Sequence, residues 1–250
     1  MMTATNTRKE ARESLTGKWG KAVLIVFVYN LISFLIQVIL EYSEDSEGLL
    51  YNIVSITQFI INVPISYGII IAFMKLKRGE EVETFDFLKL GFSNFKKSWS
   101  IAWNRFLVMI VPTLIIFAIV FALSFYSVVS SGLMSTSYSV KYASTNNLAI
   151  LIIALIAIIA CLVWSMVKRY SVELAEYISY DEPEISGKEA VKKSQEMMQG
   201  NKGNLFMLEI SFIGWSILAV LTFGIGFLWL VPYIQVSKTC FYEELKNKNV

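Results

Sequence analysis

Long apolar runs without Lys or Arg constrain this chain more than any other feature of its sequence. A helix needs about 20 apolar residues to cross the roughly 30 Å hydrocarbon core of a bilayer. Four runs meet that length, at about 22–40, 50–74, 106–127 and 148–167, and a fifth run covers 205–236. The fifth run is too long for one ordinary span and holds two glycines near its middle, so we interpret it as two helices, 204–222 and 225–244. The sequence therefore predicts an all-α membrane protein with about six transmembrane helices.

The composition also favours lipid as the solvent. Hydrophobic residues make up 55% of the chain and charged residues 17%, against roughly 45–50% and about 25% in soluble domains. The net charge of +2 gives no reason to expect a nucleic-acid partner. Histidine is absent and the two cysteines, Cys161 and Cys240, lack CxxC spacing, which excludes histidine-based triads and the usual zinc sites. We therefore expect no catalytic site, no metal and no cofactor.

Positive charge predicts the orientation of the chain. With a cytoplasmic N-terminus, six spans leave only Lys141 outside among the 22 Lys and Arg residues. Five spans would also place Lys238, Lys246 and Lys248 outside. The positive-inside rule therefore favours six spans with both termini in the cytoplasm. The cytoplasmic basic residues can attract anionic lipid headgroups, although this effect is nearly generic.

The three predicted pairs of spans share a repeated pattern. Lys-Glu-Ala occurs before the first pair at 9–11 and before the third pair at 188–190, and apolar residues alternate with lysines at helical spacing over 85–99. Val63-Pro64 and Val231-Pro232 are each followed by Phe nine residues after the proline. We expect three hairpins, each preceded by a short cytoplasmic interfacial helix. The alternative is that membrane helix ends attract Lys, Gly and aromatic residues in any protein.

Residues 168–203 form the largest predicted cytoplasmic segment. Apolar residues after position 171 favour a helix that continues past the membrane as far as Pro183. Ser186 and Glu189 have the spacing of a capping box, and Gly200 is a helix stop signal. We expect this segment to be helical.

Two stretches of the chain resemble a known family. At the N-terminus the resemblance rests on Ala11-Arg12, Leu15, Gly17, Trp19-Gly20 and Ala22. At the C-terminus it rests on Ser194, Met198, Gly200, Lys202, Leu205-Phe206, Ser211 to Trp215, Thr222, Gly224 to Gly226, Trp229, Pro232-Tyr233 and Phe241-Tyr242. This pattern is similar to domain of unknown function 975, which implies a polytopic protein of the bacterial cell membrane and supplies no activity. Within it we expect a structural motif of Gly200, Gly214, Trp215, Gly224, Gly226 and Pro232.

Polar residues inside the spans are the candidate site. Asn62 and Ser66 flank Pro64 on one helical face, and the proline frees a backbone carbonyl, so these residues can line a polar cavity. Glu209 is the only acid well within a span, although it departs from the family pattern and can pair with Lys202 or Lys238. Polar groups in such positions more often join neighbouring helices than bind ligands.

Three classes of function remain. A non-enzymatic scaffold or lipid- or partner-binding protein comes first, and a transporter or exporter component for a small or amphipathic substrate comes second. An intramembrane enzyme comes last because histidine and paired carboxylates are missing. The low density of polar residues in the spans favours the first class over the second, since a solute pathway needs polar lining.

Overall fold

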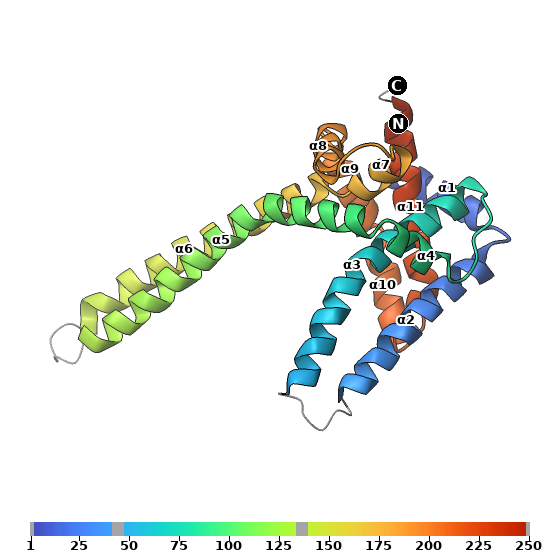
Figure 1. The fold of residues 1–250 in the computed structure, drawn as a ribbon. Helices are drawn as coiled ribbons and strands as arrows, with labels where there is room; N and C mark the ends of the chain where they lie inside the picture. Colours follow the sequence, from blue (N-terminus) through green and yellow to red (C-terminus); the bar gives the residue numbers. More distant parts are fainter. Residues whose placement is uncertain (1–2, 42–47, 134–139, 249–250) are drawn as a thin grey trace. The chain divides into compact units, whose positions relative to one another are not determined.

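The computed structural model describes residues 3–41, 48–133 and 140–248. Every regular element in these ranges is an α-helix, which confirms the all-α prediction (Figure 1). The helices are α1 (Ala4–Leu15), α2 (Trp19–Glu41), α3 (Leu49–Arg78), α4 (Asp86–Ser93), α5 (Phe95–Leu133), α6 (Val140–Ser171), α7 (Ala175–Asp181), α8 (Gly187–Met197), α9 (Lys202–Ile210), α10 (Ile213–Leu221) and α11 (Phe227–Lys248). Short helices α1, α4 and α8 precede α2, α5 and α9, where interfacial helices are expected.

Five helical stretches in the described ranges are long and apolar enough to cross a membrane. They lie in α2, in α3, in α5, in α6 with α7, and in the consecutive pair α9–α10, and they overlap the first five predicted spans. Helix α11 covers the sixth predicted span but is not among the five. Its C-terminal half carries four charged residues between Lys238 and Lys246, which lower its mean hydropathy. The count of six spans therefore stays a prediction based on charge.

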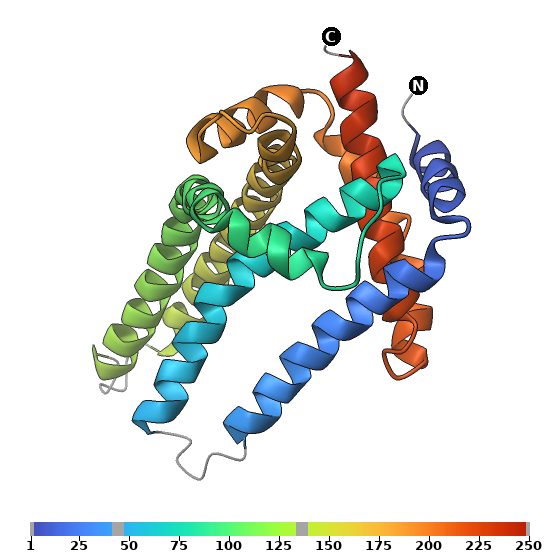
Figure 2. The same cartoon turned by 45° about the vertical axis from the view of Figure 1, so that its right-hand side comes forward.

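The chain divides into two compact units, one made of residues 1–104 and 171–250 and the other of residues 105–170. The second unit contains most of α5 and α6, which run side by side in both views (Figures 1 and 2). The first unit contains all the other helices, including every one that packs around the candidate sites described below.

Helices α3 and α4 cross at a distance that only glycine permits. A Cβ added at Gly68 of α3 would overlap the Phe87 carbonyl oxygen and lie 2.8 Å from the backbone nitrogen of Gly91. A Cβ added at Gly91 of α4 would in turn lie 2.8 Å from the carbonyl carbon of Pro64. The two backbones are therefore in direct contact, with Gly68 and Gly91 at the crossing point.

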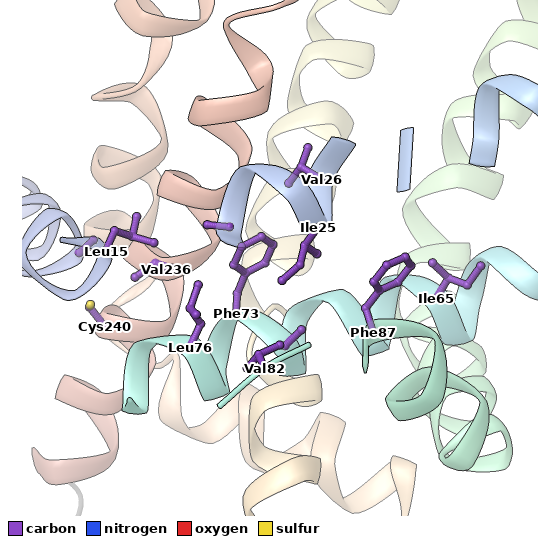
Figure 3. Packing of buried hydrophobic residues seen from close by; sticks show 13 residues of the cluster. Leu15, Ile25, Val26, Ile65, Phe73, Leu76, Val82, Phe87, Val236 and Cys240 are labelled. Carbon is purple, nitrogen blue, oxygen red and sulfur yellow. The ribbon is translucent and has the colours of Figure 1, made fainter. Parts of the chain in front are cut away.

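The core of the first unit joins both ends of the chain. Buried residues of α1, α2, α3 and α11 meet in one cluster that also contains Val82 and Phe87 (Figure 3). Leu15 of α1, Phe73 of α3 and Cys240 of α11 are at most 1% exposed. The first and last helices therefore pack on the same α3 segment.

A five-residue turn, 222–226, joins α10 to α11. Gly224 has φ +87°, a left-handed conformation that glycine adopts at low cost, and its N–H donates to the Ala219 carbonyl at 3.1 Å. The Thr222 hydroxyl donates to the same carbonyl and accepts the Gly226 N–H at 2.8 Å. A Cβ at Gly226 would lie 2.7 Å from the Ala219 Cα, so this glycine allows α10 and α11 to approach closely.

The segment 168–203 is helical, but the helix expected to run to Pro183 is interrupted. Helix α6 ends at Ser171 and α7 begins at Ala175. The buried Ser194 hydroxyl accounts for the break, because it donates to the Ser171 carbonyl at 3.0 Å and accepts the Leu174 N–H at 3.1 Å. The capping box at the start of α8 is confirmed, with both of its reciprocal hydrogen bonds present.

Candidate functional site

The residues predicted to form one polar cavity lie in different surroundings. Asn62 lines a hollow of about 210 Å³ together with Gln58 of α3 and Tyr29 of α2. Ser66 lines a separate hollow of about 240 Å³ with Gln235 of α11, and Tyr29 borders both. Asn62 and Ser66 therefore line two different hollows, and a polar cavity that they share stays a prediction.

The carbonyl freed by Pro64 already has a partner. Proline has no N–H, so the carbonyl four residues earlier, at Ile60, lacks its helical donor. The indole N–H of Trp99 donates to this carbonyl at 3.2 Å, and the Trp99 ring packs edge-on against Phe59. A side chain at the start of α5 thus occupies the Ile60 carbonyl. A ligand in the predicted cavity would have needed this carbonyl as its acceptor.

Glu209 belongs to a half-buried group of three charges. Its carboxylate lies 2.8 Å from the Lys238 ammonium of α11, which also binds Glu173 at 2.6 Å. The Lys238 side chain is only 12% exposed. Lys202 and Lys238 were the two expected partners of Glu209, and the fold brings Lys238 into contact with it. One cation shared by two carboxylates holds α9, α11 and the 172–174 turn together.

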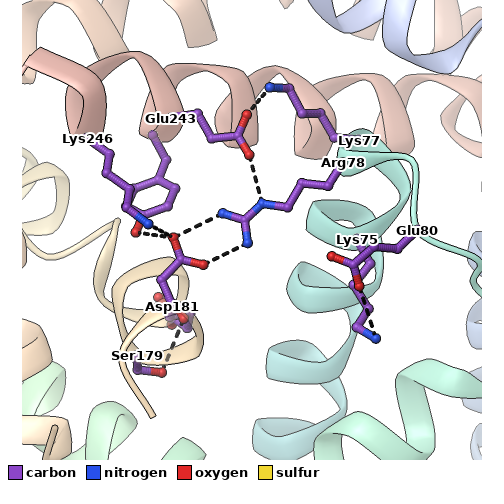
Figure 4. Close-up of polar contacts among 10 residues, drawn as sticks. Lys75, Lys77, Arg78, Glu80, Ser179, Asp181, Glu243 and Lys246 are labelled. Carbon is purple, nitrogen blue, oxygen red and sulfur yellow. Dashed lines mark hydrogen bonds and ion pairs between the residues drawn. The ribbon is translucent and has the colours of Figure 1, made fainter. Parts of the chain in front are cut away.

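A second charge cluster joins α3, α7 and α11 (Figure 4). The Asp181 side chain, 5% exposed, binds Arg78 at 2.7 Å and Lys246 at 2.5 Å and accepts the Tyr242 hydroxyl at 2.9 Å. Glu243 accepts the Arg78 Nε–H at 2.9 Å and also pairs with Lys77. Charges that the sequence places at three separate helix ends are therefore paired with one another. This cluster has a structural role, because it holds the ends of α3, α7 and α11 together.

A groove of about 370 Å³ lies between α1, the start of α2, α10 and α11. Its walls are mostly aromatic and aliphatic, and one cationic side chain borders it. The lining residues are Arg12, Trp19, Trp215, Leu218, Ala219, Thr222, Gly226, Trp229, Leu230 and Tyr233. Its volume is within the range of about 300–1,000 Å³ that is typical of small-molecule sites.

Aromatic contacts and two hydrogen bonds from side chains to backbone carbonyls build the floor of this groove. The Tyr233 ring meets the edge of Trp19 at 6.2 Å and of Phe212 at 5.0 Å between ring centroids. Its hydroxyl donates to the Arg8 carbonyl at 3.1 Å, and the Arg8 guanidinium donates to the Ser211 carbonyl at 3.0 Å. That carbonyl lies at the break between α9 and α10. Helix α1 is therefore fixed to Ser211, between α9 and α10, and to Tyr233 of α11, at the point where the groove begins.

The groove contains Trp215 and Gly226 of the predicted structural motif, and the other members have different surroundings. Gly224 forms the turn at the end of the groove. Gly200 follows α8 with φ +74°. Pro232 is buried inside α11. Gly214 faces open space, since an added Cβ would meet no atom within 4 Å.

The sequence did not indicate that Arg12 borders a groove or that Asp181 is the centre of a charge cluster. Arg12 carried only part of the family resemblance, and apart from Trp19 the other residues that line the groove are about 200 residues away in sequence. In the described ranges there is no group of three His, Cys, Asp or Glu residues that could hold a metal ion.

The chain belongs to the family described as protein of unknown function DUF975, whose sequence profile matches residues 1–249. The match covers the middle of the chain as well as the two ends that carry the resemblance seen in the sequence. No curated protein and no solved structure matches the chain significantly.

Proposed function

We propose that this chain is a non-catalytic, multi-pass membrane protein that binds lipid in the groove between α1 and the α10–α11 hairpin. The observation that carries the proposal is the groove itself, whose walls contain Trp19, Trp215, Trp229 and Tyr233. Tryptophan and tyrosine are enriched where proteins meet the membrane–water boundary, because one end of each ring system is apolar and the other is polar. A concave aromatic surface at that level fits an amphipathic molecule.

The topology that we propose has three hairpins entering from the cytoplasm, with both termini on the cytoplasmic side of a bacterial cell membrane. The apolar helices α2, α3, α5 and α6 support the first two hairpins. The tight turn at 222–226 and the contact between Gly226 and Ala219 support the third. The alternative, a transporter or exporter component, needs a continuous polar path, and the separate hollows at Asn62 and Ser66 favour it less.

Single-cysteine labelling tests the topology. In a background without Cys161 and Cys240, a cysteine at Ser46 should react with an impermeant maleimide from outside intact cells. A cysteine at Ser186 or Asn249 should react only after permeabilisation. Ser46 and Asn249 lie outside the described residues. External labelling at Asn249 would refute the proposed topology of the third hairpin.

Photo-crosslinking tests lipid binding. The purified protein in mild detergent is mixed with a phosphatidylcholine that carries a diazirine in its acyl chain, and the modified peptides are mapped by mass spectrometry. We expect modification of α10 and α11 around Trp215 and Trp229, and its loss when Leu218→Trp fills the groove. Leu218 is 55% exposed, so the larger side chain should not disturb the core. Equal modification of the wild type and Leu218→Trp would refute the proposal.

A further inference from the structure

We propose that the groove selects an anionic phospholipid, with the acyl chain between Trp215 and Trp229 and the phosphate-bearing headgroup bound by Arg12. This inference rests on the proposed function, because it assumes that the groove holds lipid. It adds the chemical class of the lipid and the residue that recognises it.

The apolar walls alone cannot make the groove selective. Inside a membrane an acyl chain is already surrounded by apolar groups, so moving it from bulk lipid into the groove gives little hydrophobic gain. Selection must therefore come from the polar end of the lipid. Among the described residues that line the groove, Arg12 alone carries a charged side chain. An arginine guanidinium binds phosphate with two parallel hydrogen bonds and stays charged at every physiological pH.

The charges of α1 leave Arg12 available. In the described part of the chain, the other charged side chains of this helix all have protein partners. Arg8 donates to the Ser211 carbonyl, Lys9 pairs with Glu13 and Glu10 pairs with Lys77. Arg12 lies one turn after Arg8 and is exposed, and no carboxylate among the described residues forms an ion pair with it. Arg12 lies beside the groove, on the same face of α1 as Arg8. Its guanidinium is therefore suited to bind an anion from outside the protein.

Unused hydrogen-bond donors line the same groove. The indole N–H groups of Trp19, Trp215 and Trp229 have no acceptor among the residues that the structure describes. An indole N–H can only donate, so it needs a hydrogen-bond acceptor. The ester carbonyls and phosphate oxygens of a phospholipid are such acceptors.

The polar and apolar parts of the groove follow the order found in a lipid. Gly226, directly before α11, and Tyr233, within α11, mark the two ends of the groove. At 1.5 Å per residue they are about 10 Å apart along the helix axis. Tyr233 is the end next to α1 and Arg12, as its hydroxyl bonds the Arg8 carbonyl. The other end of the groove, next to the 222–226 turn, is formed by Trp229, Gly226 and Thr222. A headgroup at Arg12 therefore places the acyl chain against the tryptophans of the hairpin.

Native mass spectrometry tests this selection. The wild-type protein, Arg12→Gln and the matched control Lys9→Gln are each titrated in detergent with dioleoylphosphatidylglycerol and with dioleoylphosphatidylcholine. Lys9 is a mostly exposed cation on the same helix and does not line the groove. We expect the wild type and Lys9→Gln to prefer the anionic lipid about fivefold or more, the factor that one surface cation gives. Arg12→Gln should bind both lipids equally, with unchanged thermal unfolding.

The outcomes separate this inference from the proposed function. Equal binding of both lipids by the wild type, with loss of both in Leu218→Trp, would overturn the headgroup selection and leave lipid binding intact. An equal loss of preference in Arg12→Gln and Lys9→Gln would also overturn it, because general surface charge would then account for the preference. Lipid binding that Leu218→Trp leaves unchanged would overturn the inference together with the proposed function.

Discussion

The glycine crossing of α3 and α4 gives the sharpest test of the fold. Gly68→Ala would insert a methyl group between two backbones, where no side chain can move aside. Overpacking of a well-packed site costs about 1–3 kcal/mol, and the rigid backbone of Phe87 and Gly91 places this site at the upper end. Alanine offsets about 1 kcal/mol through its higher helix propensity. We therefore expect a net loss of about 2 kcal/mol in the free energy of unfolding.

Gly214→Ala is the matched control, because it makes the same chemical change in another membrane helix. An added Cβ there meets no atom within 4 Å, so only the propensity gain of up to about 1 kcal/mol remains. Thermal unfolding in mild detergent measures both variants. At about 2–4 °C per kcal/mol for a chain of this size, Gly68→Ala should unfold roughly 4–8 °C below the wild type. The packing argument is refuted if Gly68→Ala unfolds no lower than Gly214→Ala.

Four other variants test three separate contacts. Lys238→Met should lower the free energy of unfolding by about 2 kcal/mol, because it removes the cation that two half-buried carboxylates share, whereas Glu209→Gln keeps the pair of Lys238 with Glu173 and should cost about 1 kcal/mol or less; equal melting temperatures would contradict this. Gly226→Ala should reduce the yield of folded protein on gel filtration, since the methyl group pushes α10 away from α11, and a normal yield would count against the close turn. Ser186→Ala should speed amide hydrogen exchange in the first turn of α8 and leave the other helices unchanged. The Ser186 backbone N–H lowers the pKa of the Glu189 carboxyl, so the stabilisation that this carboxyl gives to α8 is complete above its usual pKa of 4.5 and should fade as the pH falls through the lower folded value. Equal protection of this turn at neutral and at acidic pH, measured relative to the intrinsic exchange rate at each pH, would refute this role.

Local patterns in the sequence predicted the structure well where the partners are close in the chain. The apolar runs located α2, α3, α5 and α6 because crossing a bilayer requires length and composition that any window reveals. The capping box of Ser186 and Glu189 was predictable for the same reason, since its partners are three residues apart.

Non-local contacts were beyond such reasoning. Pro64 indicated a freed carbonyl at Ile60, but its partner, Trp99, lies 39 residues further along the chain. The break after Ser171 depends on the Ser194 hydroxyl, which only the packing of α8 brings close. The groove was missed because Arg12 and Tyr233 come from opposite ends of the sequence.

The union of the two chain ends has a consequence for the order of assembly during synthesis. Arg8 bonds a carbonyl 203 residues later, and the Tyr233 hydroxyl bonds a carbonyl 225 residues earlier. At roughly 5–20 residues per second, the ribosome needs about 10–45 s to make the intervening chain. Helix α1 must therefore wait without its main packing partner until α11 is made. The groove, which α11 completes, forms last.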